Sequence, residues 1–398
     1  MASKIAITGM GIISAIGNSV AENLDSLLQN KSGLDKIKYL STKHKNDFLV
    51  GEVKKSNQEL ATILGLPKDH SFTRTALLGA IAAKEAVKNA NLTWDDQDKV
   101  GLISSTSVGG MDQSELYFFD YENHPEKQKF ILSHDAGDSS MKIAEIIGLE
   151  GYVSTVSTAC SSAANAVIMG ARLISSGKLD CVIVGGTDAL SKFTLNGFNS
   201  LMILSDQLNQ PFDENRKGLN LGEGAAFLVL ESEEHALKNQ RPIKAYLSGF
   251  GNANDAHHQT ASSENGEGAF LAMQKALAVA EISPENIDYI NAHGTATRNN
   301  DASESAALLR IFDEKTLCFS STKPFTGHTL AAAASIEAVF SILALENQKV
   351  WANLNFEQRM ESYNLQPQTE ISSKKIEYVL SNSFGFGGNC STLIFNKA

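Results

Sequence analysis

Apolar and polar positions alternate along the chain with two periods, one typical of strands and one typical of helices. Runs of β-branched and small residues predict strands at residues 4–8, 100–105, 153–158, 181–186, 227–230, 244–248, 287–291, 317–321 and 376–381. Apolar side chains recurring every three to four residues predict helices at residues 19–29, 72–90, 141–147, 163–174, 231–239, 270–280, 302–312 and 335–345. This alternation predicts an α/β protein whose sheets are covered by helices on both faces.

The pattern suggests two halves of similar design. The segment Gln240-Arg241-Pro242 is the best place for a boundary, which divides the chain into residues 1–240 and residues 241–398. In each half a strand leads into a small-residue turn that carries a reactive side chain, Cys160 in the first and His293 in the second. We therefore expect a duplication, although the similarity is not a sequence repeat.

Composition indicates a globular chain. Hydrophobic residues make up 42% and charged residues 20%, with 7 prolines, so disorder is not expected. No apolar run approaches the roughly 20 residues that span a bilayer, and the first residues lead into a strand without the layout of a signal peptide. We expect a cytoplasmic protein that does not enter a membrane.

The formal net charge of −11 argues against a nucleic-acid partner, because phosphate binding requires clustered Lys and Arg. An acidic protein partner remains possible if a local basic patch receives it. Lys127 with Lys129, or Arg216 with Lys217, are candidates for that patch, although ordinary solvated side chains are the favoured interpretation. The cysteines lie far apart without a C-x-x-C pair, which argues against zinc and disulfides: Cys160, Cys181, Cys318 and Cys390.

Cys160 lies on the predicted turn between a strand and a helix. The unpaired N–H groups and the positive dipole end of a helix favour a thiolate over a thiol, so this is a position for a nucleophile. A buried cysteine that serves as a small hydrophobic side chain is the alternative, and spacing alone does not reject it.

Two histidines lie in small-residue turns that follow predicted strands. His293 is in the turn Asn291-Ala292-His293-Gly294-Thr295, and His328 follows Gly327. Glycine beside each histidine lets the backbone approach a ligand closely. Of the nine histidines in the chain, we expect surface or structural roles for those without a motif around them: His44, His70, His124, His134 and His235.

A cysteine with one histidine would suit a hydrolase. Two neutral imidazoles do more, because they donate two N–H hydrogen bonds to one carbonyl oxygen and stabilise an enolate as it forms. Decarboxylation of a malonyl thioester requires such stabilisation. Lys323 and Glu337 are candidates for a buried ion pair that keeps the imidazoles neutral and oriented; two separate surface charges are the alternative.

Five motifs occur in one order over nearly the whole chain. They are Thr158-Ala159-Cys160-Ser161-Ser162, Pro211-Phe212-Asp213 with Gly222-Glu223-Gly224-Ala225, Ala292-His293-Gly294-Thr295-Ala296-Thr297, Lys323 with Gly327-His328, and Asn382-Ser383-Phe384-Gly385-Phe386-Gly387-Gly388. Any one of them is weak, but the set resembles the decarboxylating β-ketoacyl-acyl-carrier-protein synthases. The resemblance implies a thiolase-like fold, a five-layered αβαβα sandwich of two pseudo-duplicated halves.

The resemblance also implies roles for the motif residues. Cys160 would hold the acyl chain as a thioester, while His293 and His328 assist decarboxylation of malonyl-carrier protein. The N–H groups of Cys160 and Phe386 would form the oxyanion hole. Substrate contacts would come from Val108 in the acyl tunnel, Thr295 and Thr297 on the phosphopantetheine arm, and Phe384 and Phe386 beside the acyl pocket.

The resemblance implies partners rather than resident cofactors. The acyl carrier protein would deliver its 4′-phosphopantetheine arm, and no metal or redox cofactor would be needed. The chain would work as a homodimer across the strand before Cys160, or as a heterodimer with a homologous ketosynthase-like chain.

The predicted function is a β-ketoacyl-acyl-carrier-protein synthase of fatty acid biosynthesis. A ketosynthase of a discrete (type II) polyketide or aryl polyene pathway is the alternative, because only the acyl pocket would differ. Two departures from the family pattern concern that pocket: Ala331-Ala332-Ala333-Ala334-Ser335 stands where Gly-Ala-Ala-Gly is usual, and Asn389-Cys390 where Thr-Asn is typical. A non-catalytic partner subunit is disfavoured by the presence of Cys160, and a thiolase-type Cys-His-Asn enzyme by His328.

Overall fold

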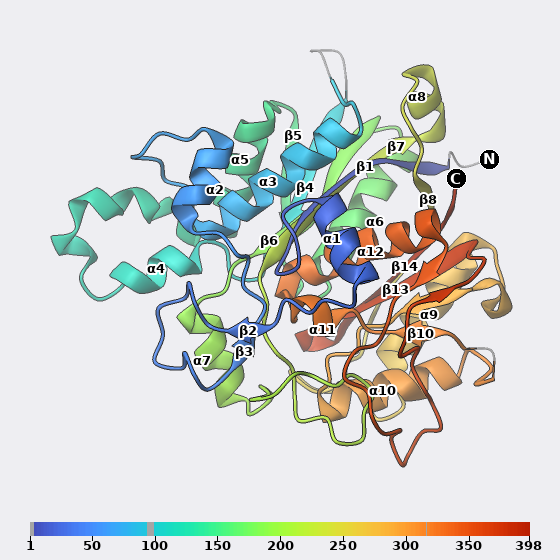
Figure 1. Ribbon diagram of the computed structural model, residues 1–398. Coiled ribbons are helices and arrows are strands. Elements are labelled where there is room, and N and C mark those ends of the chain that lie inside the picture. Colours follow the sequence, from blue (N-terminus) through green and yellow to red (C-terminus); the bar gives the residue numbers. More distant parts are fainter. Residues whose placement is uncertain (1–3, 94–98, 316) are drawn as a thin grey trace.

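The computed structural model describes residues 4–93, 99–315 and 317–398 (Figure 1). Within these residues one ten-stranded sheet has the order β10-β9-β13-β14-β8-β1-β7-β6-β4-β5. Its strands are β1 (Ile5–Ile13), β4 (Val100–Ser105), β5 (Tyr152–Val156), β6 (Cys181–Asp188), β7 (Gly224–Ser232), β8 (Ala245–Asn254), β9 (Tyr289–Asn291), β10 (Phe319–Ser320), β13 (Tyr378–Phe384) and β14 (Asn389–Lys397). Short ladders pair β2 (Asp35–Lys36) with β3 (Leu49–Val50), and β11 (Lys349–Val350) with β12 (Ser372–Ser373).

Helices cover the sheet on both faces, as the sequence predicts. The α-helices are α1 (Val20–Leu28), α2 (Asn57–Leu64), α3 (Arg74–Asn89), α4 (Met111–Tyr117), α5 (Ala136–Ile147), α6 (Ser162–Ser175), α7 (Lys192–Ser200), α8 (Glu233–Lys238), α9 (Glu267–Ala280), α10 (Arg298–Leu309), α11 (Lys323–Thr326) and α12 (Ala333–Asn347). The 3-10 helices are η1 (Tyr121–Asn123), η2 (Pro125–Phe130), η3 (Leu132–His134), η4 (Pro284–Asn286), η5 (Leu330–Ala332) and η6 (Phe386–Gly388).

The sheet consists of two halves with the same strand topology. In the described part of the first half, the order is β5-β4-β6-β7-β1; in the second it is β10-β9-β13-β14-β8. The two pairs nearest the middle of the sheet are antiparallel in each half, and the two outer pairs are parallel. The predicted duplication is therefore present in the fold, whereas the boundary at residue 240 stays a prediction.

The halves join edge to edge through β1 and β8. Ile5 pairs with Leu247, and Ile7 pairs with Ala245, in antiparallel register. Backbone hydrogen bonds thus continue across the middle of the molecule and join the two halves into one ten-stranded sheet.

Three layers of helix alternate with the two halves of the sheet. Helices α3 and α5 pack on the outer face of the first half, and α9 with α10 on the outer face of the second. Helices α6 and α12 lie between the halves and contact each other, with one hydrophobic cluster around them. This arrangement is the predicted five-layered sandwich.

Helix α12 lies in the middle layer, and every side chain from Ala333 to Leu345 is buried. In the part of the chain that the structure describes, Leu330–Asn347 is long and apolar enough to cross a membrane by length and composition. The expectation that no apolar run approaches that length is wrong for this segment. Its 18-residue stretch is 89% buried inside the fold, because both halves pack against it.

Glycines let the outer helices approach the central strands in the same way in both halves. A Cβ added at Gly11 of β1 would lie 2.1 Å from the carbonyl oxygen of Ala82 in α3. One added at Gly251 of β8 would lie 2.1 Å from the carbonyl oxygen of Ala272 in α9. Small side chains on both sides of each contact therefore set the separation of helix and sheet.

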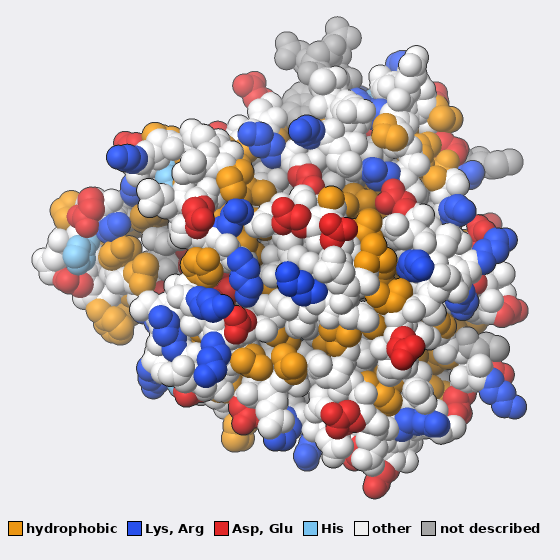
Figure 2. All heavy atoms as spheres, viewed as in Figure 1, with side chains coloured by type: hydrophobic (Ala, Val, Ile, Leu, Met, Phe, Trp, Pro, Cys, Tyr) orange, Lys and Arg blue, Asp and Glu red, His pale blue; other side chains and the backbone are white. Residues whose placement is uncertain are grey.

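Several elements differ from the prediction. Helix α8 begins at Glu233 rather than Glu231, because Glu231 still belongs to β7, where its buried carboxylate accepts a hydrogen bond from Thr8 and pairs with His235. The pattern also missed α2, α7 and β14, and it treated residues 111–140 as irregular. Those residues contain α4, η1, η2 and η3, which form a projecting arm (residues 111–135) with exposed apolar side chains on its surface (Figure 2): Leu116, Phe118, Phe119, Ile131 and Leu132.

Candidate active site

Cys160 lies on a sharp turn between β5 and α6, as predicted. Ala159, the preceding residue, has φ of +53°, a left-handed conformation that is costly for a side chain other than glycine. The hydroxyl group of Ser162 donates a hydrogen bond back to the carbonyl oxygen of Ala159 and holds the turn closed, while the Ser161 hydroxyl has two acceptors in reach, the Thr158 carbonyl oxygen and Oδ1 of Asn389. The turn places Cys160 before the first residue of the helix, with 6% of its surface exposed.

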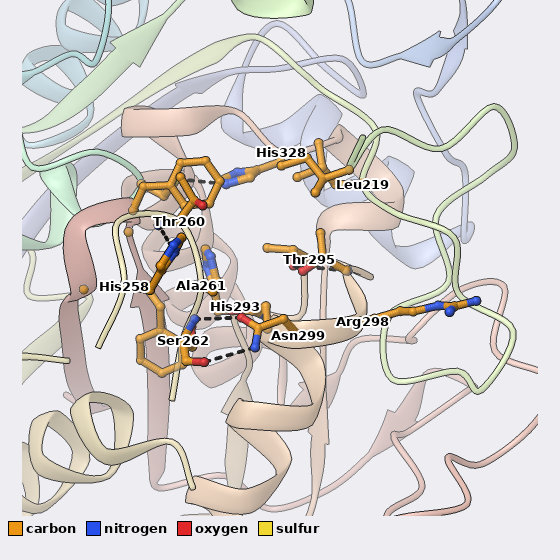
Figure 3. A pocket seen from close by; sticks show the side chains of 18 of the residues that line it. Leu219, His258, Thr260, Ala261, Ser262, His293, Thr295, Arg298, Asn299 and His328 are labelled. Carbon is orange, nitrogen blue, oxygen red and sulfur yellow. Dashed lines mark hydrogen bonds between the residues drawn. The ribbon is translucent and has the colours of Figure 1, made fainter. Parts of the chain in front are cut away.

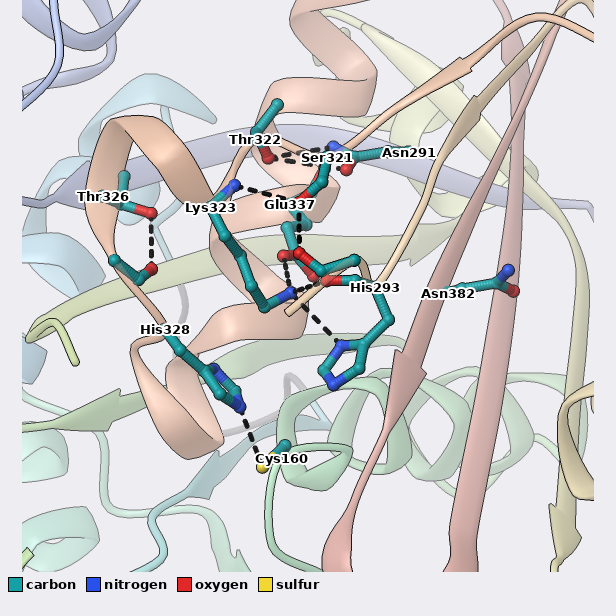
Figure 4. A network of polar contacts seen from close by, with 12 residues as sticks. Cys160, Asn291, His293, Ser321, Thr322, Lys323, Thr326, His328, Glu337 and Asn382 are labelled. Atoms are coloured by element: carbon teal, nitrogen blue, oxygen red, sulfur yellow. Dashed lines mark hydrogen bonds and ion pairs between the residues drawn. The ribbon is translucent and has the colours of Figure 1, made fainter. Parts of the chain in front are cut away.

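The two predicted histidines converge on this cysteine. Nε2 of His328 lies 3.1 Å from Sγ of Cys160, and the rings of His293 and His328 are 5.4 Å apart at 85° (Figure 4). His293 follows β9, and His328 lies between α11 and η5, so the second half supplies both rings while the first supplies the sulfur. Three segments far apart in the sequence thus meet around one point.

Lys323 and Glu337 form the buried ion pair that the sequence suggested. Nζ of Lys323 lies 2.5 Å from Oε1 of Glu337 and 3.2 Å from Nδ1 of His293, and it also donates to the His293 carbonyl oxygen (Figure 4). A lysine ammonium only donates hydrogen bonds, so Nδ1 of His293 is an acceptor and its ring proton is on Nε2. The ion pair therefore selects the tautomer that presents an N–H group toward Cys160.

Both imidazoles are neutral at ordinary pH. Burial lowers the pKa of His293 well below its usual value, and the nearby charge of Lys323 and the His328 ring lower it further. Burial, followed by the Lys323 charge, lowers the pKa of His328 in the same way. Burial raises the pKa of Glu337 above its usual value, and the charge and hydrogen bond of Lys323 oppose this shift. The expectation of neutral, oriented rings agrees with this environment.

The structure contradicts the expectation of a thiolate at Cys160. Burial raises the pKa of the Cys160 thiol to about 12, and the Lys323 charge and the N–H groups of Phe386 and Cys160 lower it only in part. The helix end alone does not compensate for loss of water around the sulfur. Cys160 is therefore a neutral thiol beside the neutral imidazole of His328, and Nε2 of that ring is positioned to take the thiol proton.

The segment Gly385–Gly388 closes the site from another side. A Cβ at Gly385 would lie 2.8 Å from the Thr158 carbonyl oxygen and 3.1 Å from the Cys160 nitrogen, so the two segments touch through backbone. The ring of Phe386 stacks on Phe198 of α7 at 5.8 Å. This contact brings the Phe386 N–H group to the same sulfur as the Cys160 N–H group.

A cavity of about 500 Å³ opens over these groups (Figure 3). Its lining includes most of the predicted site residues: Cys160, His293, Thr295, Thr297, His328, Phe384 and Phe386. The Thr295 and Thr297 hydroxyl oxygens are 2.9 Å apart, and the Phe384 ring lies edge-on to His293 at 5.6 Å. Behind the cavity, Lys323 contacts the His293 ring and pairs with Glu337.

Val108 is the predicted site residue that lies elsewhere. Among the described residues that line the cavity, Val108 is not present. Its N–H group hydrogen-bonds to Asp188, a buried carboxylate that also accepts from Thr106 and from the N–H of Ala331. Burial raises the pKa of Asp188 to about 6. The sequence analysis missed Asp188, whose position at the end of an apolar strand was the available signal.

The basic side chains that the sequence analysis proposed as a patch for an acidic partner have different environments in the structure. Lys217 and Arg298 are exposed and line the cavity. Arg216 is buried, and its guanidinium donates to the carbonyl oxygens of Asp213 and Arg298, so it is structural. On the arm, Lys129 donates to the Asp69 carbonyl oxygen.

Comparison with known proteins agrees with this geometry. Residues 2–236 match the family model "Beta-ketoacyl synthase, N-terminal domain", and residues 244–357 match "Beta-ketoacyl synthase, C-terminal domain". A 3-oxoacyl-[acyl-carrier-protein] synthase 2 of Staphylococcus aureus (strain N315) is 34% identical over 408 residues, which cover 99% of this chain and 98% of that protein.

Solved structures of similar proteins share the whole fold. A chain of "The ishigamide ketosynthase/chain length factor" has a TM-score of 0.92 at 29% identity, with 100% of both chains covered. A chain from a type II PKS acyl-carrier protein in complex with its ketosynthase, bound to the hexaketide, has a TM-score of 0.87 at 26% identity, again with 100% of both covered. The chain therefore belongs to the β-ketoacyl synthase family of acyl-transferring condensing enzymes, with the thiolase-like fold.

Proposed function

We propose that the chain is a β-ketoacyl-acyl-carrier-protein synthase that joins malonyl-carrier protein to an acyl group held on Cys160. The products are a β-ketoacyl-carrier protein and carbon dioxide. The observation that carries this proposal is the 3.1 Å approach of His328 Nε2 to Cys160 Sγ, with the Nε2–H of His293 facing the same cavity.

The first half-reaction loads the acyl group. As Sγ of Cys160 attacks the thioester carbonyl carbon, His328 Nε2 takes the thiol proton. The carbonyl oxygen becomes an oxyanion that receives hydrogen bonds from the N–H groups of Cys160 and Phe386. The bond to the pantetheine sulfur then breaks, and that sulfur leaves with the proton. Because the free thiol has a raised pKa, proton removal and attack must be coupled.

The second half-reaction uses both imidazoles as donors. The carbon–carbon bond to the malonyl carboxylate breaks, carbon dioxide leaves, and the electron pair forms an enolate on the thioester. Between the half-reactions the proton of the neutral His328 ring is exchanged with water from Nδ1 to Nε2, because the ring that accepted a proton at Nε2 must now donate from that atom. Nε2–H groups of His293 and His328 then donate to the enolate oxygen, for which neutral rings are required. The carbanion attacks the acyl carbonyl carbon, and Sγ of Cys160 leaves as a thiolate that takes a proton from water. Lys323, paired with Glu337, keeps the His293 ring oriented.

The acyl carrier protein is the proposed partner. Its 4′-phosphopantetheine arm would enter through the cavity mouth, where the exposed cations of Lys217 and Arg298 suit its phosphate. Thr295 and Thr297 offer hydroxyl groups to the amides of the arm, and Phe384 and Phe386 flank the acyl group. The reaction as written needs no further cofactor and no metal.

A dimer through β5 is the proposed assembly. In the described part of the sheet β5 is an edge strand that pairs only with β4, so its other side offers unpaired backbone groups. The apolar surface of the projecting arm would also be covered in such a dimer. The partner is a second copy or a homologous ketosynthase-like chain. We propose a cytoplasmic location for the assembly and the half boundary near residue 240.

Fatty acid biosynthesis is the first proposed pathway, and a type II polyketide or aryl polyene pathway is the second. The second is supported by the similarity of the chain to a ketosynthase/chain length factor and to a structure of a type II PKS ketosynthase with its acyl-carrier protein. Assays with carrier proteins bearing long saturated, polyunsaturated or aryl acyl groups separate them. Turnover of long saturated chains would support fatty acid synthesis; turnover of the unsaturated or aryl groups alone would support the second pathway.

The activity itself is tested with three proteins: the native chain, Cys160→Ala and His328→Asn. We expect acylation of the native chain at Cys160, no acylation of Cys160→Ala, and loss of malonyl-carrier-protein decarboxylation in His328→Asn. Mass spectrometry of the intact protein and release of carbon dioxide measure the two steps. Unchanged decarboxylation in His328→Asn would refute the two-histidine mechanism.

A further inference from the structure

The side chain of Asn389 lies where three segments behind the cysteine meet. Its Oδ1 atom is 2.7 Å from Oγ of Ser161, 2.8 Å from Nδ2 of Asn165 and 3.0 Å from Nδ2 of Asn252. These groups come from the turn before α6, from α6 itself and from β8, while Asn389 begins β14. One carboxamide oxygen thus connects β8 and β14 of the second half to the segment that carries the cysteine.

The contact between Asn389 and Ser161 links the two segments whose N–H groups face Sγ, those of Cys160 and Phe386. Ser161 directly follows Cys160, and Asn389 is three residues after Phe386. The Asn389 carbonyl oxygen also accepts the N–H of Gly385, 2.8 Å away, so the loop from Gly385 to Asn389 is closed on itself. Movement of Asn389 relative to Ser161 would therefore move the Phe386 N–H relative to the Cys160 N–H.

We propose that Asn389 is a positioning residue that sets the spacing of these two N–H groups around the acyl oxyanion. The inference rests on the proposed function, because it assumes that Cys160 is acylated. Asn389 itself lies outside the cavity lining in the described residues, so it acts through Ser161 and Phe386 rather than on substrate.

Loss of the Asn389 oxygen should leave the fold intact. The Ser161 hydroxyl also lies 2.8 Å from the Thr158 carbonyl oxygen, and Nδ2 of Asn165 lies 2.8 Å from Oγ1 of Thr158. Nδ2 of Asn252 has Oδ1 of Asn165 at 3.0 Å. Each donor therefore keeps another acceptor, and no buried polar group loses its last hydrogen-bond partner. What is lost is the contact that holds Asn389 against the Cys160 turn.

The two half-reactions should respond differently. Acylation of Cys160 depends on both backbone N–H groups, and loss of alignment at an oxyanion site costs about tenfold to a hundredfold in rate. Decarboxylation places its charge on the enolate oxygen, which receives hydrogen bonds from the imidazoles instead. A merely destabilised protein would lose both activities together.

The test measures both half-reactions in Asn389→Ala and in Asn389→Leu, which keeps the branched shape, fills the space and removes the acceptor. We expect acylation of Cys160 by acyl-carrier protein to fall about tenfold to a hundredfold in both variants. Release of carbon dioxide from malonyl-carrier protein should stay within about threefold of the native rate. Native acylation in Asn389→Leu would show that filling space is sufficient and would overturn the proposal, as would an equal loss of both activities.

A double variant checks the route through Ser161. If Asn389 acts through that hydroxyl, Ser161→Ala combined with Asn389→Ala should slow acylation no more than the larger single change does. If the losses of acylation rate in the two single variants multiply in the double variant, the route through Ser161 is contradicted. Asn23→Ala is the matched control: Asn23 is a buried amide in α1 whose Oδ1 accepts from Ser14 and whose Nδ2 donates to the Ser19 carbonyl oxygen. It should lower thermal stability without separating the two rates.

The outcomes for the native protein keep the two proposals apart. If the native chain neither acylates at Cys160 nor decarboxylates malonyl-carrier protein, the proposed function is wrong. If it does both and the Asn389 variants match it, only the positioning role is wrong.

Discussion

The Nζ atom of Lys323 lies 2.5 Å from Oε1 of Glu337, with both side chains almost fully buried behind the imidazoles. Taking two charges out of water is costly, so each of them depends on the other. The pair stabilises the fold little in total, but neither residue can be neutralised alone without a large effect.

Glu337→Gln should lower the free energy of unfolding by about 3–5 kcal/mol, because it leaves the Lys323 ammonium buried without a counter-charge. Urea denaturation followed by circular dichroism measures this change. Glu377→Gln is the control, since Glu377 pairs with Lys375 at 3.3 Å on the exposed surface and its loss should cost less than about 1 kcal/mol. Equal effects of the two substitutions would contradict the importance of burial.

Lys323→Met should make decarboxylation more sensitive to acid. In the native site burial and the Lys323 charge lower the pKa of both histidines, so the rings stay neutral well below pH 6.5 and the rate should hold there. Removal of the charge lets both pKa values rise, and the rate should then begin to fall at a higher pH than in the native protein. A pH profile of carbon dioxide release from pH 5 to pH 8 measures the shift.

The same lowered pKa values affect stability in a defined direction. In the unfolded chain the two imidazoles take up protons as the pH falls through about 6.5, whereas in the native site they stay neutral. Their contribution to stability is therefore present above that pH and is lost progressively on acidification. The measurement is the free energy of unfolding of the native protein from pH 7 to pH 5, with a double His293→Phe and His328→Phe variant as the reference for all other groups. If the difference between the two proteins does not change over this range, the assignment is contradicted.

Alkylation of Cys160 by iodoacetamide should be slow at pH 7 and should rise about tenfold per pH unit above it. The reason is the pKa of about 12 that burial gives the thiol, which leaves few thiolates at neutral pH. Mass spectrometry of the labelled cysteine over pH 6 to pH 10 measures the rate. A plateau with a midpoint near pH 7 would show a preformed thiolate and so a site that is more hydrated than the structure indicates.

Gly385→Ala should slow acylation by about tenfold or more, because the added Cβ would lie 2.8 Å from the Thr158 carbonyl oxygen. This contact would force the segment Gly385–Gly388 away from Cys160. Gly197→Ala in α7 is the matched control, since no atom lies within 4 Å of the added methyl group. Single-turnover acylation with acyl-carrier protein measures both. Equal rates in the two variants would mean that the segment near Gly385 moves freely.

Most of the strands and helices around the site could be predicted from the sequence, and so could the meeting of Cys160, His293 and His328. Strand exits in an α/β fold gather at one edge of a sheet, so reactive residues in such turns are brought together by topology. The Lys323–Glu337 pair could be proposed for a similar reason, because both residues flank the His328 turn.

Features that depend on packing could not be predicted. Burial of Cys160 is a property of the assembled layers, and it reverses the expectation of a thiolate that the helix end suggested. Asp188 and Asn389 connect segments about 80 to 230 residues apart, and no local pattern shows their acceptors. The resemblance placed Val108 in the acyl tunnel, whereas in the structure its N–H group hydrogen-bonds to Asp188 and it is not among the described residues that line the cavity.

The pairing of Ile5–Ile7 with Ala245–Leu247 has a consequence for how this architecture can be divided. Separately expressed fragments cut near Gln240 would each present a bare strand edge complementary to the other. Such fragments are suited to non-covalent reconstitution, and a chimera that exchanges one of them must preserve the hydrogen-bonding register of these three residue pairs.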